Sequence, residues 1–342
     1  MTQQDSKLRV AVIGAGNICR SCHIPCLTGL GMDIACVVDP SNKALSSIRG
    51  NLPSTVKYVG SGQLDLPSGI DCAVVCSPTS LHAAQVESLL ENNLHVLCEK
   101  PIALTEAEAK RIVGLAAERK RVLQVGYYRR FHPASRLVKE LVRSAELGRP
   151  RSCTVRAGHI FNDAPASLMD KSLSGGGVLI DFGVHVIDRL YSWFDDVVLL
   201  QYSDDSRGGV EANAVVRLEG RVGTVTLPIV VALSRTNDLG YFSVVHFENA
   251  SVAVQLNSGH EVELISASPV GLLGQSHRLT AKVQVGPAKG AIEYFCDQWQ
   301  EFTARIAGSP ERISSLADAV RTTAMVETCY ANRWALELEW GW

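Results

Sequence analysis

The first part of the chain alternates short apolar runs with segments of helical length. Residues 8–13, LRVAVI, form an apolar run that Gly14 ends, and a predicted helix follows at 17–29. Four more apolar runs are separated in part by predicted helices at 79–92 and 105–119; the runs lie at 34–38, 72–76, 95–98 and 122–125. Buried strands that alternate with helices predict βαβ units in a doubly wound parallel sheet. We therefore expect an α/β domain over residues 1–126.

The pattern changes in the rest of the chain, which we expect to form a second, α+β domain over residues 127–342. Alternating or β-branched runs, separated by Gly, Asn and Asp turns, lie at 151–160, 212–219, 222–232, 241–247, 251–256 and 260–265. This pattern predicts a large and mostly antiparallel sheet with one face towards solvent or an interface. Four helices are predicted to pack on this sheet, the last two of them packing back from the C-terminal end; they lie at 133–146, 177–193, 289–306 and 314–333.

Composition narrows the function classes. The chain has 342 residues, with 33 Lys and Arg against 35 Asp and Glu, which gives a formal charge of −2. A nucleic-acid-binding protein usually carries an excess of basic residues, so this class is disfavoured. We find no N-terminal export signal, and no apolar run approaches the roughly 18 residues of a membrane span. We therefore expect a cytoplasmic protein with no nucleic-acid or membrane partner.

Ten cysteines are present, and most of them lie within apolar strands or amphipathic helices. They are interpreted as small buried apolar residues in a reducing compartment. Cys19, Cys22 and Cys26 have a spacing that a metal site could use. Because these three fall on the helix that follows the first strand, we expect no metal.

The turn after the first strand, Gly14-Ala15-Gly16-Asn17-Ile18-Cys19, has the pattern G-x-G-x-x-G with Cys in the third place. The first glycine permits a tight turn and the second a close approach to pyrophosphate, whereas the third position needs only a small residue. A tight turn with no ligand is the alternative. The position between a buried strand and a helix favours dinucleotide binding at Gly14, Gly16, Asn17 and Ile18.

Asp39 ends the next apolar run, 23 positions after Gly16. A carboxylate there accepts hydrogen bonds from ribose hydroxyls and repels a 2′-phosphate, which favours NAD over NADP. Lys43 and Arg49 are close in sequence and could compensate. The alternative for Asp39 is a turn or helix N-cap residue.

Two later segments combine polar residues with a strand end or a glycine run. Glu99-Lys100-Pro101 follows an apolar strand, at the carboxyl edge where an open α/β sheet binds its ligand. Residues 175–188, GGGVLIDFGVHVID, open a helix on which Asp181, His185 and Asp188 share one face. A polar stripe on an otherwise apolar helix needs a partner or a purpose.

Together these motifs resemble the glucose-fructose oxidoreductase/inositol dehydrogenase (Gfo/Idh/MocA) family. The resemblance covers nearly the whole chain and also includes Ser77-Pro78-Thr79 with His82, Gly126-Tyr127 with Arg130, and a strand-rich second half. It implies a Rossmann domain that holds NAD(P) and an antiparallel-sheet domain that forms the substrate wall and often an oligomer interface. It also implies a sugar, amino sugar or cyclitol such as inositol as substrate, and a homodimer or homotetramer.

The resemblance assigns roles residue by residue. Lys100 corresponds to the lysine that reaches the nicotinamide ribose and the reacting oxygen, while Asp181 and His185 correspond to the Asp-x-x-x-His pair. In hydride transfer to or from a carbinol carbon, His185 would be the general base, Lys100 would stabilise the alkoxide, and Asp181 would orient the substrate. The alternatives are a surface lysine paired with Glu99, a core histidine, and a helix-start carboxylate.

The remaining site candidates have weaker signals. Ser77, Pro78, Thr79, His82 and Glu99 are expected near the cofactor, and Tyr128 and His159 near the substrate; Tyr127, Arg130 and Asn162 are weaker candidates, and Asp188 is expected to be structural.

Two departures from the family pattern stand out. Cys19 replaces a small Gly or Ala, and Glu211-Ala212-Asn213 replaces a Glu-Asp-Asn segment at the start of a sheet strand. The second change affects expectations for the interface and the substrate wall but leaves the hydride chemistry untouched.

The leading hypothesis is an NAD-dependent dehydrogenase or ketoreductase that acts on a sugar, a cyclitol such as inositol, or an amino sugar. Two alternatives come from other classes. One is a glycosidase or lyase that oxidises C3 of a glycoside transiently and needs no net NAD turnover. The other is a non-catalytic NAD-binding regulator, which would need neither a base nor an alkoxide stabiliser.

Overall fold

The computed structural model describes residues 7–61, 63–162, 165–257, 259–266, 270–272, 275–277 and 279–336. They form two compact units. Unit 1 contains the described residues up to Tyr128 together with Ala291–Val320. Unit 2 contains Arg129–Gly290 and the described residues from Arg321 onward.

Unit 1 is built on a parallel sheet, as the alternating pattern predicts. Its six strands lie in the order β3-β2-β1-β4-β5-β6. Their bounds are β1 Arg9–Ile13, β2 Asp33–Val38, β3 Lys57–Val59, β4 Cys72–Val75, β5 His95–Cys98 and β6 Leu123–Val125. β1 lies in the middle of the sheet, where it pairs with β2 on one side and with β4 on the other. This strand order has its switch point between β1 and β4, and open α/β sheets bind ligands at the carboxyl ends of the strands there.

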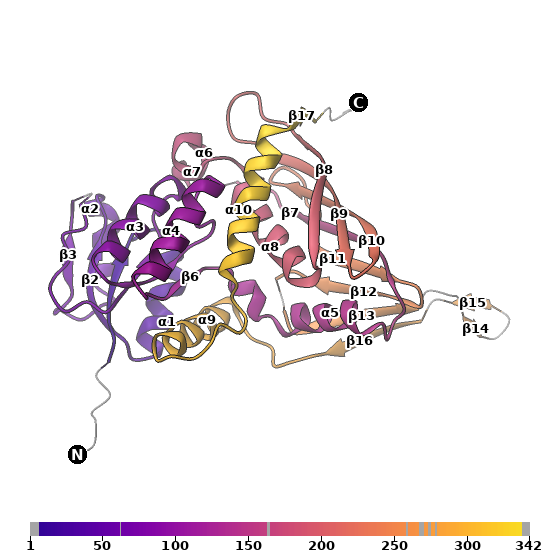
Figure 1. The fold of residues 1–342 in the computed structure, drawn as a ribbon, viewed down its shortest axis with the longest axis horizontal. Coiled ribbons are helices and arrows are strands. Elements are labelled where there is room, and N and C mark those ends of the chain that lie inside the picture. The colour runs from indigo at the N-terminus through magenta and orange to yellow at the C-terminus, as the bar shows by residue number, and fades with distance from the viewer. Residues whose placement is uncertain are drawn as a thin grey trace, which may run out of the picture. The chain divides into compact units, whose positions relative to one another are not determined.

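Short helices connect these strands (Figure 1). They are the π-helix η1 Cys19–His23, α1 Ile24–Gly29, α2 Asn42–Arg49, the 3-10 helix η2 Thr79–Leu81, α3 His82–Glu91 and α4 Glu106–Glu118. Local capping explains where two of them begin. The Ser41 hydroxyl accepts from the Ala44 amide at the start of α2, and Thr105 with Glu108 forms a capping box at the start of α4.

Helix α9, Ala291–Ile306, corrects one expectation. Its sequence predicts an amphipathic helix packed on the second sheet, but α9 belongs to unit 1 and contacts α1 and η1 (Figure 1). Trp299 and Phe302 of α9 are fully buried in the same core as Val10 and Val12 of β1. An apolar helix face shows only that a helix needs a partner, so periodicity cannot choose between two sheets.

Unit 2 contains the predicted second sheet, which is mixed and mostly antiparallel. Its nine strands lie in the order β16-β13-β12-β11-β7-β10-β9-β8-β17. They are β7 Pro150–Gly158, β8 Asp196–Asp204, β9 Asn213–Val222, β10 Val225–Ser234, β11 Gly240–Phe247, β12 Ala250–Gln255, β13 Glu261–Ser266, β16 Thr280–Gln284 and β17 Arg333–Ala335. β7 pairs with β10, and β8 with β17, in the parallel direction. A separate pair is formed by β14 Val270–Leu272 and β15 Gln275–His277.

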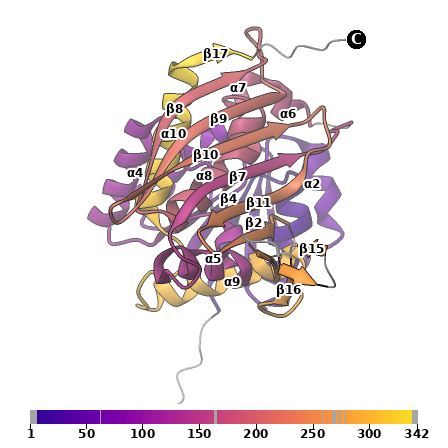
Figure 2. The ribbon, with the colours of Figure 1, turned by 90° about the vertical axis from the view of Figure 1, so that its right-hand side faces the viewer.

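The two faces of the large sheet differ. Leu227, Ile229 and Val231 of β10 are buried on the face that carries the helices, whereas Val230 and Ala232 lie half-buried on the other face. Figure 2 looks onto that second, outer face, with β8, β9, β10, β7 and β11 running across the view in front of α8. The remaining helical elements are η3 Tyr128–Phe131, α5 Pro133–Ser144, α6 Ala166–Met169, α7 Lys171–Ser174, the π-helix η4 Leu179–Gly183, α8 Val184–Trp193 and α10 Leu316–Ala331. Tyr128 of η3 and Leu316–Val320 of α10 belong to unit 1, and the rest of these elements belong to unit 2. Among the described residues, no helix has the length and apolarity that a membrane span requires.

Candidate active site

The glycine turn of unit 1 has the geometry that a dinucleotide site needs. Gly14 has φ +94°, and a Cβ there would lie 2.8 Å from the backbone of Cys76 and Ser77, so only glycine fits. At Gly16 a Cβ would meet no atom within 4 Å, which leaves this backbone open to an incoming group. Cys19 is fully buried in the core where the helix meets the sheet, as its small size allows. These residues fit a bound pyrophosphate.

Polar contacts order the first turn of this helix. Asn17 Oδ1 accepts from Arg20 at 3.3 Å and from the Ser21 hydroxyl at 3.2 Å, and Ile18 packs against the unit 1 core. The helix continues as the π-helix η1. Single π turns occur frequently at functional sites, and here one follows the glycine turn directly.

Asp39 binds two backbone segments. Its Oδ2 accepts from the Ala15 amide at 2.7 Å, and its Oδ1 accepts from the Ser41 amide at 2.7 Å. The carboxylate thus ties the glycine turn to the start of α2, whose N-cap is Ser41. A carboxylate has about four lone-pair positions, so these two bonds leave it able to accept from ribose hydroxyls as well.

His82 connects two of the predicted cofactor segments. Its Nε2 lies 2.9 Å from the Ser77 carbonyl oxygen and its Nδ1 lies 2.7 Å from that of Pro101. Burial lowers the pKa of His82, and a neutral ring donates to one of these oxygens at a time. The Ser77 hydroxyl donates to Gln85 at 2.5 Å, and Pro78 precedes the 3-10 turn that Thr79 begins. His82 is therefore buried between the two loops and holds them together.

Glu99 is buried, with 6% of its surface exposed, and its carboxylate faces His23. Glu99 Oε1 lies 2.9 Å from His23 Nε2, while Trp299 Nε1 donates to His23 Nδ1 at 3.1 Å. Because the indole N–H can only donate, Nδ1 is the acceptor and the neutral ring donates from Nε2 to Glu99. The sequence analysis singled out Glu99 but missed His23 and Trp299, which come from distant parts of the chain.

This arrangement fixes the start of the Lys100 segment. The Lys100 amide donates to Glu99 Oε2 at 3.3 Å. A Cβ at Gly126 would lie 2.9 Å from Glu99 Oε1, which explains the glycine after β6. Burial alone would raise the Glu99 pKa, but the bond from His23 and the charge of Lys100 bring it below its usual value. Tyr128 also lies in unit 1, where its ring stacks on Phe295 at 4.6 Å.

In unit 2, Asp181 and His185 lie where the π-helix η4 passes into α8. Asp181 is half-buried, and its Oδ2 accepts from the Arg235 guanidinium at 2.7 Å. Arg235 was missed in the sequence; its only signal is a charged residue directly after the apolar strand β10. His185 is 7% exposed, and its ring contacts Phe182 edge-on at 6.4 Å.

Aromatic residues of unit 2 surround this helix turn. The Phe182 ring contacts Tyr241 at 5.2 Å, and Tyr241 Oη is hydrogen-bonded to His159 Nδ1. The Arg129 guanidinium lies over the Phe182 ring at 4.5 Å. Through Tyr241, His159 is therefore connected to Phe182. Tyr241 and Arg129 were not singled out in the sequence.

Asp188 and Arg130 form a buried ion pair. Arg130 donates from Nε and from a terminal nitrogen to the two carboxylate oxygens of Asp188, both at 2.7 Å. The Arg130 side chain is 7% exposed and the Asp188 side chain is 2% exposed. This geometry places both residues in the packing of unit 2 and agrees with the structural role expected for Asp188.

The cysteines near the glycine turn are largely enclosed in unit 1. Cys19 and Cys26 are fully buried, and burial raises the pKa of Cys22 to about 11, which disfavours the thiolate that a metal needs. Among the described residues, no group of three His, Cys, Asp or Glu side chains has the arrangement of a metal site.

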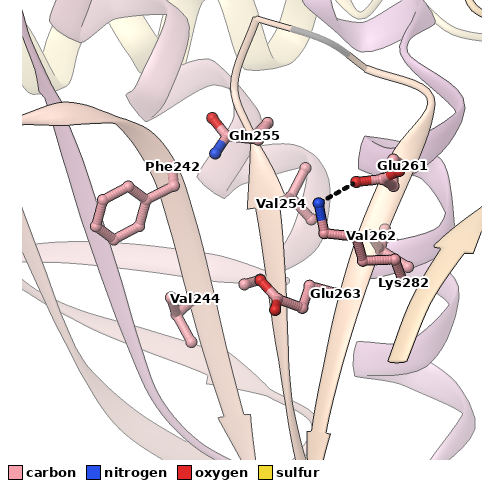
Figure 3. Close-up of a pocket in the computed structure, with 9 residues that line it drawn as sticks. Phe242, Val244, Val254, Gln255, Glu261, Val262, Glu263 and Lys282 are labelled. Atoms are coloured by element: carbon pink, nitrogen blue, oxygen red, sulfur yellow. Dashed lines mark ion pairs between the residues drawn. The ribbon is translucent and has the colours of Figure 1, made fainter. Parts of the chain in front are cut away.

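A hollow of about 290 Å³ is lined by none of the site residues described above (Figure 3). Phe242 and Val244 of β11, Ala253 of β12 and Glu263 of β13 line it, and Lys282 forms an ion pair with Glu261 at 3.5 Å beside it. Neighbouring strand residues point to opposite faces, so Phe242 faces away from the side on which Tyr241 contacts Phe182. This hollow belongs to the outer face of the sheet.

Comparison with known proteins gives one family for both units. Residues 8–127 match the family model described as "Oxidoreductase family, NAD-binding Rossmann fold", and residues 135–252 match the GFO/IDH/MocA C-terminal domain. The D-glucoside 3-dehydrogenase of Escherichia coli is 30% identical over 198 residues, which cover 54% of this chain and 53% of that protein. The chain thus spans about half the length of the curated relatives it matches.

Two solved structures share the fold over nearly the whole chain. KijD10, a 3-ketoreductase of Actinomadura kijaniata in complex with NADP and TDP-benzene, has a TM-score of 0.81 at 17% identity, covering 97% of this chain and 100% of that one. A levoglucosan dehydrogenase in complex with NADH has a TM-score of 0.80 at 19% identity, covering 96% and 98%.

The contacts of Glu99 predict a pH-dependent contribution to stability. Because its folded pKa lies below the ordinary value of 4.5, its charged form stabilises the fold above about pH 4.5 and loses this effect as the pH falls through the folded pKa. We expect Glu99→Gln to lower the free energy of unfolding at neutral pH, with the difference from wild type shrinking below pH 4.5. Urea denaturation across this range measures it, and a difference independent of pH would contradict the assignment.

Proposed function

Because the chain belongs to the GFO/IDH/MocA family of NAD-binding oxidoreductases, we propose that it transfers a hydride between nicotinamide and a carbinol or carbonyl carbon of a sugar, amino sugar or cyclitol. A bound nicotinamide dinucleotide would supply the hydride acceptor or donor. The observation that carries the proposal is the Asp181–His185 pair at the π turn of η4, with Asp181 fixed by Arg235.

Three side chains have proposed roles in the reaction. His185 takes the hydroxyl proton as general base when the alcohol is oxidised and returns it when the ketone is reduced. Lys100 stabilises the charge that develops on the reacting oxygen. Asp181 accepts a hydrogen bond from the substrate and so orients the reacting carbon.

The side chains around Asp181 suit a hydroxylated ring. Phe182 and Tyr241 offer aromatic faces to C–H groups, while His159 and Tyr241 Oη offer polar atoms to hydroxyls. The similar proteins from E. coli and A. kijaniata are named a glucoside 3-dehydrogenase and a 3-ketoreductase. Glycosides therefore belong beside inositols, aldoses and amino sugars among the substrates we propose.

For the cofactor, we propose Gly14, Gly16, Asn17, Ile18 and Asp39 as the adenosine and pyrophosphate end. Ser77, Pro78, Thr79, His82, Glu99 and Lys100 would form the nicotinamide end, with Glu99 and His82 acting through the backbone that they hold. Asp39 carries a negative charge beside the glycine turn, so NAD is the proposed partner in preference to NADP.

We also propose that the outer face of the large sheet binds a second copy of this chain in a homodimer or homotetramer. Small and apolar side chains lie next to one another across this face: Val230 pairs with Thr154, Thr154 with Val244, and Val244 with Ala253. An apolar sheet face of this kind favours association when another apolar surface covers it.

The first prediction from the proposed function concerns His185. If it is the general base, His185→Ala should lower kcat by about 10²-fold or more and leave the affinity for NAD unchanged. The assay follows NADH absorbance with NAD and a panel of inositols, aldoses, amino sugars and glycosides, and calorimetry measures NAD binding. An unchanged kcat would exclude this role.

The same panel separates the classes of function. NADH that accumulates with some substrates supports a dehydrogenase and identifies its substrate class. Glycoside cleavage without net NADH would instead support the transient-oxidation hydrolase or lyase. NAD binding with neither reaction would overturn the proposed activity for every substrate tested and favour the regulator.

The second prediction concerns Asp39 and uses two variants. Asp39→Asn removes the charge but keeps an oxygen acceptor for the Ala15 amide, whereas Asp39→Ala removes both. If the charge selects NAD, both variants should narrow the preference for NAD over NADP by about tenfold, or about 1.4 kcal/mol, in Kd. If Asp39 serves only to hold the turn, Asp39→Asn will keep the full preference and Asp39→Ala will weaken both cofactors alike.

The third prediction concerns the outer face. Val244→Glu places a charge among Thr154, Ala253 and Phe242, and a buried unpaired charge opposes association. Sedimentation velocity should show wild type as a dimer or tetramer and the variant as a monomer with an unchanged circular dichroism spectrum. A monomeric wild type, or a variant that assembles normally, would refute the proposed interface.

A further inference from the structure

Glu211, Ala212 and Asn213 make contacts in two directions within unit 2. On one side they bind the start of the helix that carries Asp181. Glu211 Oε2 accepts from the Gly177 amide at 2.7 Å, and Oε1 accepts from the Leu179 amide at 2.9 Å. The Glu211 carbonyl accepts from the Val178 amide at 3.0 Å. Three successive amides, which a helix start leaves without partners inside the helix, are therefore satisfied by one residue.

On the other side, the same segment binds the turn after β10. The Ala212 carbonyl accepts from the Arg235 amide at 2.9 Å. Asn213 Oδ1 accepts from the Ser234 hydroxyl at 2.6 Å and from the Thr236 hydroxyl at 3.0 Å. These bonds set the position of the backbone that carries Arg235.

The Arg235 guanidinium then connects the two sides. It donates to Asp181 at 2.7 Å and lies 5.6 Å from the centre of the Phe161 ring. The Arg235 side chain is 10% exposed and that of Asp181 is 31% exposed, so the guanidinium is largely enclosed while the carboxylate still reaches solvent. A guanidinium that is enclosed and held by its backbone fixes a carboxylate better than a mobile surface cation does.

The glycine run makes this arrangement possible. A Cβ at Gly177 would overlap the Glu211 backbone, and one at Gly176 would overlap the Tyr330 hydroxyl. The Tyr330 hydroxyl donates to Glu211 Oε1 at 2.8 Å, so α10 contributes a further hydrogen bond to the Glu211 carboxylate. Burial raises the pKa of Glu211, and the bonds from Leu179, Tyr330 and Gly177 offset this only in part.

We propose that Arg235 is a positioning residue for Asp181, and that Glu211–Asn213 is the bracket that holds both partners of this ion pair. The inference rests on the proposed function in one respect, because it gives Asp181 the task of orienting the substrate. Arg235 acts through Asp181 and not on the substrate itself. Ala212, which departs from the family pattern, contributes through its backbone carbonyl, so the loss of a carboxylate there does not disturb the bracket.

The test compares Arg235→Gln, Asp181→Asn and the double variant. We expect Arg235→Gln to lower kcat/KM by about 10-fold to 10²-fold, and Arg235→Lys to restore part of this loss. If Arg235 acts through Asp181, the double variant should be no slower than Asp181→Asn alone, because the coupled residue is already lost. Additive losses in the double variant would overturn the positioning role.

Arg321→Gln is the matched control. Arg321 also donates to a carboxylate of unit 2, that of Asp196, at 2.7 Å, and also lies over an aromatic ring, that of Tyr191, at 4.1 Å. These partners, together with the Asp195 carbonyl to which Arg321 also donates, lie outside the set of residues proposed for the site. Its loss should leave kcat/KM unchanged, and a loss equal to that of Arg235→Gln would show a general effect on the fold.

Hydrogen exchange tests the bracket without turnover. Glu211→Gln keeps one oxygen acceptor and loses the other, so the amides at 177–179 and at 234–237 should both exchange about tenfold faster, whereas Asp196→Asn should leave their exchange unchanged. Faster exchange at 177–179 alone would refute a shared bracket. If wild type turns over no substrate, the proposed function fails while this exchange result still decides the structural proposal.

Discussion

A carboxylate enclosed in a protein must receive hydrogen bonds from fixed partners, because its desolvation is otherwise too costly. This constraint organises each of the two units around one buried glutamate. Glu99 lies directly before Lys100 and is bound by His23. Glu211 binds the amides at the start of the helix that carries Asp181 and His185. In both units, therefore, a satisfied buried carboxylate fixes the backbone beside a proposed catalytic group.

Helices α9 and α10 each add a hydrogen bond to the contacts around one of these glutamates. Trp299 of α9 donates to His23, which in turn faces Glu99. Tyr330 of α10 donates to Glu211. Each helix thus supplies one aromatic residue whose polar atom reaches the buried network, while its apolar surface packs in the core. The bond from Tyr330 to Glu211 joins residues 119 positions apart, and the bond from Trp299 to His23 joins residues 276 positions apart.

The glycines in the two units are explained by different physical reasons. Gly14 is required for its positive φ and for the close approach of Cys76, whereas at Gly16 a Cβ would meet no atom within 4 Å, so the space beside this backbone is open. Gly176 and Gly177 are required because Tyr330 and Glu211 occupy the positions that a side chain would fill. The same residue type serves backbone conformation and ligand access in unit 1 but close packing in unit 2.

Much of the order of strands and helices followed from the sequence, because burial on one face or two leaves a local signature in the spacing of apolar residues. The sequence analysis nevertheless missed α2 and the nine-residue strand β8. The alternation through residues 8–125 specified the parallel sheet, and the glycine turn with Asp39, the Glu99-Lys100-Pro101 segment and the Asp181–His185 spacing identified the candidate site. Short edge strands such as β3 and β17 carried too few residues for a pattern. Only the tertiary structure decided the partners: α9 packs in unit 1, His23 and Trp299 bind beside Glu99, and Arg235 binds Asp181. These contacts join residues far apart along the chain, and a local pattern records that a residue needs a partner without specifying which one it meets.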